Sequence, residues 1–224
     1  MGKLIDYPDL KEQLRGILMR GDTITYLPDD EGQRQLRMYG FIRIEDNRVT
    51  VSNRVFEMRL YTYFIGESSN NNDLKQLAAA ERPAFIDRDG RLDVAKIMER
   101  FIEAHNRIHG ASTPKFLEEE GRERFFTYLS PIINGTGTYS IEEQTRDRSR
   151  MDVVIHYLGR RYIMELKIWH GERYKEKGER QIKRYLDYWG LDTGYLLSFN
   201  FNKRKKPGVR AVHVGGTLLY EGIV

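Results

Sequence analysis

Cysteine is absent from this 224-residue sequence, so it can form neither a disulfide nor a thiolate zinc site. No apolar run approaches the about 20 residues that a membrane-spanning helix needs, and the amino-terminal residues lack the hydrophobic region of a signal peptide. A loop of the form G-x-x-x-x-G-K-[ST], which cradles nucleotide phosphates, is also missing. The lack of cysteine, of a membrane-spanning segment and of a signal peptide favours a cytoplasmic protein with no membrane partner.

Charge, by contrast, is plentiful. The chain holds 37 Lys and Arg against 33 Asp and Glu, for a net charge of +4. Residues 1–113 carry 17 basic and 18 acidic side chains, and residues 114–224 carry 20 and 15, so the carboxyl-terminal half is the basic one. A basic field suits a polyanionic partner such as nucleic acid, and an ordinary solvated charged surface is the competing interpretation.

The amino-terminal part, residues 1–66, is predicted to form a small module of its own. Apolar spacing indicates helices at 9–18 and 31–39, and alternation with a turn at 45–48 indicates a β-hairpin over 41–52. Asn53 is expected to cap a further helix. Helices followed by a short hairpin predict a winged-helix-like module.

Two further segments follow. Residues 67–113 are predicted to be a linker, clearest at the polar run 68–73, and a helical connector over 93–105. Residues 114–224 are predicted to form an α/β (α+β) domain in the order helix, strand, strand, strand, helix, strand. The expected ranges of these six elements are 116–133, 138–145, 150–157, 162–169, 172–189 and 194–201, with one or two edge strands over 209–224.

Three ionisable residues stand out in the second and third of these strands. Because side chains alternate along a strand, Glu165 and Lys167 must project from the same face. A hairpin turning at 158–161 would bring Asp152 alongside them. Two carboxylates and an ammonium are costly to hold in a largely apolar sheet, so their convergence points to a functional site.

The order of elements and these residues resemble the PD-(D/E)XK nuclease superfamily, which has a restriction-endonuclease-like αβββαβ core with a mixed central sheet. Asp152 matches its first acid, and Glu165-Leu166-Lys167 matches its acid-x-lysine. Gln181 and Tyr185 resemble the Q-x-x-x-Y signature of several branches. The chain is more specifically similar to the nuclease domain that follows AAA-ATPase-like domains in bacterial proteins.

This resemblance implies an oxygen-rich site for Mg²⁺ or Mn²⁺ made by Asp152, Glu165 and the Leu166 carbonyl. The metal would activate a water that attacks the phosphodiester, and Lys167 would orient the water or stabilise the charge that builds up.

Three further residues are given catalytic roles by the same resemblance. Gln181 would hold the lysine or a phosphate oxygen, and Tyr185 would contact the nucleic-acid backbone or brace its helix. The superfamily often adds an acid from the first helix, for which Glu120 is chosen. The competing acids are Glu119, Glu123 and Glu142.

The predicted function is therefore metal-dependent hydrolysis of nucleic acid, with DNA favoured and RNA as the other substrate. The alternative is a non-catalytic nucleic-acid-binding or regulatory module of a larger ATPase. Because the phosphate-binding loop is missing, the chain is interpreted as the carboxyl-terminal fragment of a longer ATPase–nuclease, or else as a shortened relative; the fragment is favoured. An ATPase domain outside this chain is accordingly a predicted partner, and the oligomeric state is left open.

A second constellation is weaker. His105 and His109 are four residues apart on an expected helix, which is the spacing of metal ligands. The H-E-x-x-H glutamate is missing between them, so a solvated helix face is the favoured interpretation.

Overall fold

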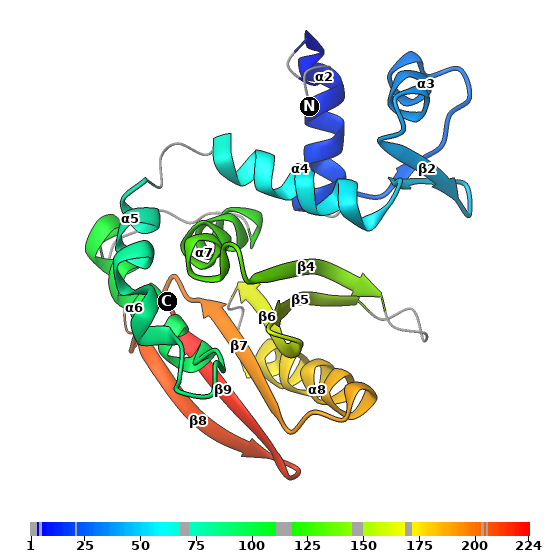
Figure 1. Cartoon of the computed structure of the whole chain (residues 1–224). Coiled ribbons are helices and arrows are strands. Elements are labelled where there is room, and N and C mark those ends of the chain that lie inside the picture. Colours follow the sequence, from blue (N-terminus) through cyan, green and yellow to red (C-terminus); the bar gives the residue numbers. More distant parts are fainter. Residues whose placement is uncertain are drawn as a thin grey trace. The chain divides into compact units, whose positions relative to one another are not determined.

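The chain divides into two compact units, Met1–Ser69 and Asn70–Val224. They are seen in a computed structural model (Figure 1). It describes residues 4, 6–20, 22–67, 72–110, 118–144, 150–168, 172–202, 204 and 206–224. Each unit is considered by itself.

The first unit combines helices with a three-stranded antiparallel sheet of order β1-β3-β2. Its elements are α2 (Pro8–Arg15), the π-helical turn η1 (Gly16–Arg20), β1 (Ile24–Thr25), α3 (Glu31–Met38), β2 (Ile42–Glu45), β3 (Arg48–Val51) and α4 (Arg54–Glu67). The predicted helices and hairpin are therefore present. The winged-helix assignment itself stays a prediction.

The hairpin of this unit turns through two residues. Asp46 and Asn47 have φ of 49° and 60°, the left-handed values that a type I′ turn requires at both central positions. Asp and Asn tolerate this conformation better than other non-glycine residues. The local sequence therefore specifies both the turn and the strand register beside it, with Glu45 opposite Arg48.

The predicted cap of α4 is also present, since the Asn53 side chain accepts a hydrogen bond of 3.0 Å from the backbone N–H of Phe56. We expect Asn53→Ala to lower the free energy of unfolding by about 1 kcal/mol, because one amide at the helix start loses its acceptor. Urea denaturation followed by circular dichroism measures this. Asn53→Asp keeps the acceptor and serves as the control, so an equal loss in both variants would contradict the capping role.

The second unit is built on a six-stranded mixed sheet of order β4-β5-β6-β7-β9-β8 (Figure 1). The β6–β7 and β7–β9 pairs are parallel and the others antiparallel. The helical elements are α5 (Asn72–Glu81), η3 (Arg82–Phe85), α6 (Val94–His109), α7 (Glu118–Ile133) and α8 (Glu172–Trp189). The strands are β4 (Gly137–Gln144), β5 (Arg150–Tyr157), β6 (Arg160–Ile168), β7 (Thr193–Phe199), β8 (Gly208–Val214) and β9 (Thr217–Ile223).

The predicted order helix, strand, strand, strand, helix, strand is present as α7, β4, β5, β6, α8 and β7. One detail of the prediction was wrong. The end of the predicted linker, residues 72–73, is already helical, because α5 begins there. Of the one or two edge strands predicted over 209–224, β8 is the edge strand, and β9 lies between β7 and β8, parallel to β7. The position of β9 in the sheet depends on tertiary packing and cannot be read from the sequence of this strand.

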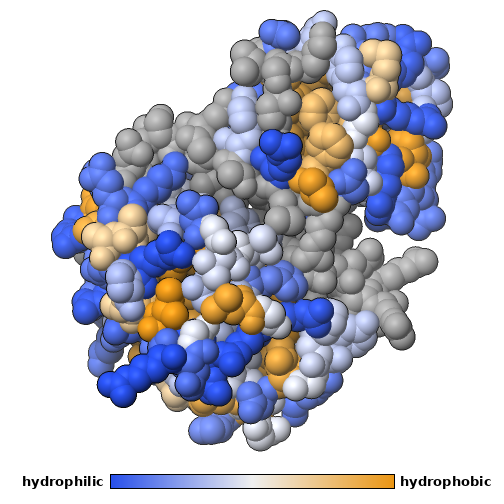
Figure 2. Space-filling view, in the orientation of Figure 1, coloured by the Kyte–Doolittle hydropathy of each residue, from blue (hydrophilic) through white to orange (hydrophobic). Residues whose placement is uncertain are grey.

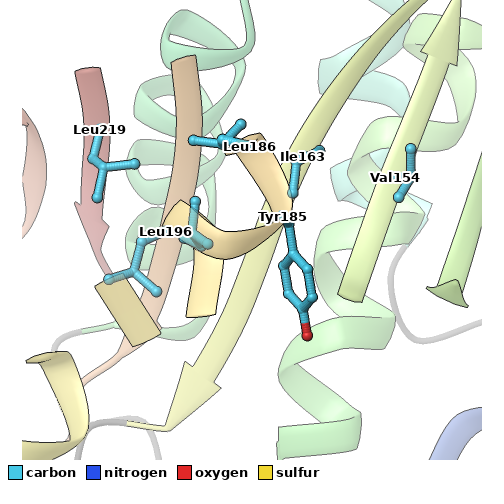
Figure 3. Close-up of a cluster of buried hydrophobic side chains, with 7 residues drawn as sticks. Val154, Ile163, Tyr185, Leu186, Leu196 and Leu219 are labelled. Carbon is cyan, nitrogen blue, oxygen red and sulfur yellow. The ribbon is translucent and has the colours of Figure 1, made fainter. Parts of the chain in front are cut away.

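Helices cover both faces of this sheet. On one face, α8 buries a cluster of side chains against four strands (Figure 3): Val154, Ile163, Ile182, Tyr185, Leu186, Leu196 and Leu219. On the opposite face, Gly222 lies against Met98 and Ile102 of α6, and Gly121 of α7 lies against Phe199. Side chains alternate along strands, so neighbouring residues of one strand point to opposite faces and pack against different helices.

The face of the molecule shown in Figure 2 is mainly polar. On the face shown in Figure 2, hydrophilic side chains predominate and the hydrophobic ones form small, separate patches. Among the described helices, none combines the length and apolar character needed to cross a bilayer.

Candidate active site

The β5–β6 hairpin carries the predicted acids and the lysine. Its turn consists of Leu158 and Gly159, with φ of 46° and 75°, so it is a two-residue turn. The turn predicted over 158–161 is thus shorter than expected, and Arg160 and Arg161 already belong to β6. Register along the hairpin pairs Tyr157 with Arg160 and Val153 with Met164.

Glu165 and Lys167 meet on one face of β6. The Lys167 Nζ lies 2.5 Å from Oε1 of Glu165, whose side chain is only 1% exposed, while that of Lys167 is 24% exposed. A carboxylate taken out of water costs several kcal/mol unless nearby groups compensate its charge. The Glu165 carboxyl group is therefore buried, with the Lys167 ammonium between it and solvent.

The backbone of Asp152 is in β5, beside this pair. Asp152 directly precedes Val153, whose register partner Met164 directly precedes Glu165. Continued by one step, this register sets Asp152 opposite Glu165, and residues opposite each other in an antiparallel pair share a face. The Asp152 side chain lies outside the described set, so its position opposite Glu165 is inferred from the backbone register alone.

Helix α8 closes over the same face. Gly178 lies near the stem of Lys167: a Cβ added there would stand 3.8 Å from the lysine Cε. Gln181, one turn further on, donates a hydrogen bond of 3.1 Å from its Nε2 to the Tyr185 hydroxyl. Tyr185 belongs to the same buried cluster as Ile163 (Figure 3).

These positions discriminate between the roles predicted for the two α8 residues. Tyr185 is 1% exposed, which leaves almost no surface for a nucleic-acid backbone, so bracing the helix is the role that its burial favours. Gln181 is half-buried and its amide is directed along the helix to Tyr185. Gly178, on the preceding turn of α8, approaches Lys167.

Leu166, whose carbonyl was predicted as a metal ligand, is fully buried in β6 and stands in register with Leu197 of β7. Its side chain faces away from Glu165 and Lys167, as alternation requires. Only a backbone oxygen of this residue is therefore of use to a cation on the α8 face.

Glu120, the acid chosen from the first helix, lies near the start of α7. Its side chain is 52% exposed, and its Oε2 is 3.8 Å from Nη2 of Arg124. None of the contacts described for it reaches Glu165 or Lys167. The side chains of the competing acids Glu119 and Glu142 lie outside the described set, and Glu123 accepts the Thr127 hydroxyl hydrogen bond through its backbone oxygen.

Sequence reasoning missed a second buried acid. Glu221 of β9 is 3% exposed, and its Oε2 lies 2.7 Å from Nη2 of Arg210 on β8. Glu165 and Glu221 are both in register with Leu196, on either side of β7, so the two acids lie on one face two strands apart. Alternation in 217–223 places Glu221 on the same strand face as the buried Leu219. Sequence alone does not show that β9 lies beside β7, which brings this face of β9 next to Leu196.

The histidine pair departs from its prediction. His105 is 2% exposed, with Nε2 3.0 Å from Nη1 of Arg124, so the solvated face predicted for it is wrong. Its ring centroid lies 4.7 Å from that of His109. Burial, assisted by the Arg124 charge, lowers the pKa of His109 below its ordinary value. The buried face of α6 extends further around the helix than spacing indicated, because β7 also packs there and places Phe199 near His105.

Among the described side chains, no three His, Cys, Asp or Glu residues gather as a metal site would require. Asp152 is outside that set, so Glu165 is the one described carboxylate of the predicted ligands. No protein-family model matches the chain, and comparisons with curated proteins and with solved structures also returned no match. Function is therefore inferred from the residues of this chain.

Proposed function

We propose that this protein is a metal-dependent nuclease that hydrolyses phosphodiester bonds of nucleic acid, with DNA as the favoured substrate. The observation that carries the proposal is the pair on β6: a carboxylate that is 1% exposed, with a lysine ammonium 2.5 Å away on the same strand face. Burying a carboxylate opposes folding, and Glu165 differs from the equally buried Glu221 in having the backbone of a second acid, Asp152, on the neighbouring strand.

The donor set fits a hard divalent cation such as Mg²⁺ or Mn²⁺. Asp152, Glu165 and the Leu166 carbonyl offer oxygen ligands, which these ions prefer to nitrogen or sulfur. The metal would supply Lewis-acid activation of a water and of the scissile phosphate. With the αβββαβ order of elements, this donor set supports the restriction-endonuclease-like assignment.

The chain's own residues have separate tasks in this proposal. Glu165 supplies a fixed negative charge whose position the surrounding core determines. Lys167, partly exposed, presents a cation at the solvent side, where the anionic phosphate would arrive and where negative charge builds up during hydrolysis. Tyr185 of α8 is buried in the same cluster as Ile163 of β6, and Gln181 donates a hydrogen bond to the Tyr185 hydroxyl.

A panel of substrates tests the proposal. Linear, circular and single-stranded DNA and RNA are incubated with the protein in Mg²⁺, in Mn²⁺ or in EDTA. We expect cleavage of at least one DNA substrate with metal and none in EDTA. Metal-independent, salt-sensitive binding without cleavage would instead support a nucleic-acid-binding module, and the absence of both would support a regulatory or assembly module of an ATPase.

A further inference from the structure

A pocket of about 760 Å³ lies in the second unit, away from Glu165 and Lys167. It is formed where β6 and β7 begin and α8 ends, and a tight loop spanning residues 87–93 closes one side. Its size falls within the about 300–1,000 Å³ of ordinary ligand pockets. The proposed nuclease chemistry makes no use of this pocket.

The floor of the pocket is apolar and aromatic. Leu92 and Tyr195 are 3% and 7% exposed, and partly buried Tyr162, Trp189 and Leu191 complete it. Flat side chains at the base of a recess offer a stacking surface, which suits a planar ring better than an aliphatic chain. The floor therefore favours a ligand with an aromatic ring.

The loop that forms the wall is held in place before any ligand arrives. The Asp87 carboxylate accepts hydrogen bonds from the backbone N–H groups of Asp89 and Arg91, at 2.9 and 2.7 Å. The Leu92 N–H donates to the Tyr162 hydroxyl at 2.9 Å, which ties the loop to β6. A preformed wall lowers the entropic cost of binding.

The rim carries equal numbers of arginines and aspartates, but they are used differently. Asp87, Asp93 and Asp192 each accept a local hydrogen bond, from the loop, from the start of α6 and from Thr193 respectively. Hydrogen bonds of this kind stabilise a carboxylate where it stands and occupy part of its acceptor capacity. The three aspartates of the rim thus stabilise the loops around the pocket.

The side chains of the three rim arginines form no such local hydrogen bonds within the described part of the chain. Among the described residues, the guanidinium groups of Arg91, Arg160 and Arg161 take part in no ion pair and no hydrogen bond. The Arg161 guanidinium lies over the Trp189 ring, 4.0 Å from its centroid. Stacking of this kind orients the planar guanidinium and leaves the N–H donors on its edge available for a phosphate.

We propose that this pocket binds a nucleotide, with the base on the aromatic floor and the phosphate against the rim arginines. A free mononucleotide and the terminal nucleotide of a strand offer this same chemistry. The inference does not rest on the proposed nuclease activity, because the pocket residues are distinct from Asp152, Glu165 and Lys167.

Fluorescence of Trp189 reports binding directly. The chain has two tryptophans, so Trp169→Phe leaves Trp189 as the sole indole. AMP, GMP, CMP and UMP are titrated separately into the full chain in EDTA, with calorimetry on the same samples in case the emission does not change. We expect saturable binding of at least one nucleotide, weakened at least about tenfold when the matching nucleoside lacks the phosphate, because the arginines then lose their ligand.

Variants distinguish binding in the pocket from nonspecific attraction of a nucleotide to positive charge. Arg161→Gln, and independently Arg91→Gln, are expected to weaken binding at least about tenfold each, since a charge-assisted contact to phosphate is removed. Arg88→Gln is the matched control, because Arg88 is exposed in the same loop but does not line the pocket. Circular dichroism verifies that each variant is folded.

The proposal is overturned if none of the four nucleotides gives saturable heat or fluorescence, or if Arg88→Gln weakens binding as much as both pocket variants. A single-stranded oligonucleotide ending in the preferred nucleotide distinguishes the two sources. Displacement by the oligonucleotide at equal or lower concentration assigns the pocket to a strand end, and failure to displace assigns it to the free nucleotide.

Discussion

Replacing Glu165 with glutamine is expected to lower metal-dependent cleavage on the order of 10³-fold, the usual scale when a group acting on the developing charge is lost. Glutamine keeps the shape of the buried side chain but removes the negative charge that a divalent cation requires. Lys167→Met is expected to lower cleavage to a similar extent. Single-turnover kinetics with saturating Mg²⁺ measure both effects. Full activity of Lys167→Met would remove the lysine from the catalytic assignment.

The two substitutions should differ in stability. Lys167→Met leaves a carboxylate that is 1% exposed without its neighbouring cation, and such a loss typically costs about 3 kcal/mol. Glu165→Gln leaves a lysine that is 24% exposed and that can turn to water, so we expect a loss of about 1 kcal/mol. Urea denaturation of the variants tests the order of these losses, which follows from burial and is independent of catalysis.

The Glu221–Arg210 pair supplies a matched control. Glu221 is buried on the same sheet face, paired with a cation at 2.7 Å, and has no assigned part in cleavage. Glu221→Gln should therefore lower stability as Glu165→Gln does but leave cleavage per folded molecule unchanged. Equal loss of cleavage in the two variants would mean that stability, rather than chemistry, explains the effect of Glu165.

Phe101→Ala is expected to lower the free energy of unfolding of the second unit by about 4 kcal/mol. Phe101 of α6 is fully buried, and its ring makes edge contacts with Phe125 of α7 and Phe199 of β7, at centroid distances of 5.2 and 6.4 Å. Truncation removes both contacts and leaves a cavity between the two helices and the sheet. Thermal and urea denaturation, followed by near-ultraviolet circular dichroism, measure the loss.

This result would show that α6 belongs to the core of the second unit. Phe101→Leu is the control, because it keeps most of the apolar volume and should cost clearly less than alanine. If both variants unfold like the parent chain, α6 acts as the connector that the sequence predicted and contributes little to the core.

Local sequence signals were sufficient where neighbouring residues determine the conformation. Asp46-Asn47 specified a type I′ turn because both residues tolerate positive φ. Asn53 and the charged, amphipathic run that became α8 gave correct helix positions, since capping and spacing depend on residues within one or two turns. The shared face of Glu165 and Lys167 followed from the period of a strand alone.

Other features depended on partners distant in the sequence. The helical α5 was missed, because a polar run rich in asparagine precedes it and its apolar stripe is short. His105 was expected in water, and its burial depends on Arg124 and Phe199, which arrive from α7 and β7. The aromatic pocket beneath Arg161 had no sequence signature at all, because its residues come from three separate segments of the chain.

The sequence by itself determined the order of the helices and strands, the face on which Glu165 and Lys167 project, and the chemistry that an acid-x-lysine pair can offer. These follow from local periodicity and from side-chain type. Only the tertiary structure decided how deeply Glu165 is buried, that β9 inserts beside β7 and brings Glu221 into the same row, and that Arg161 stacks on Trp189 above a pocket. Burial, strand order and pockets are produced by residues distant in the chain, so no local pattern contains them.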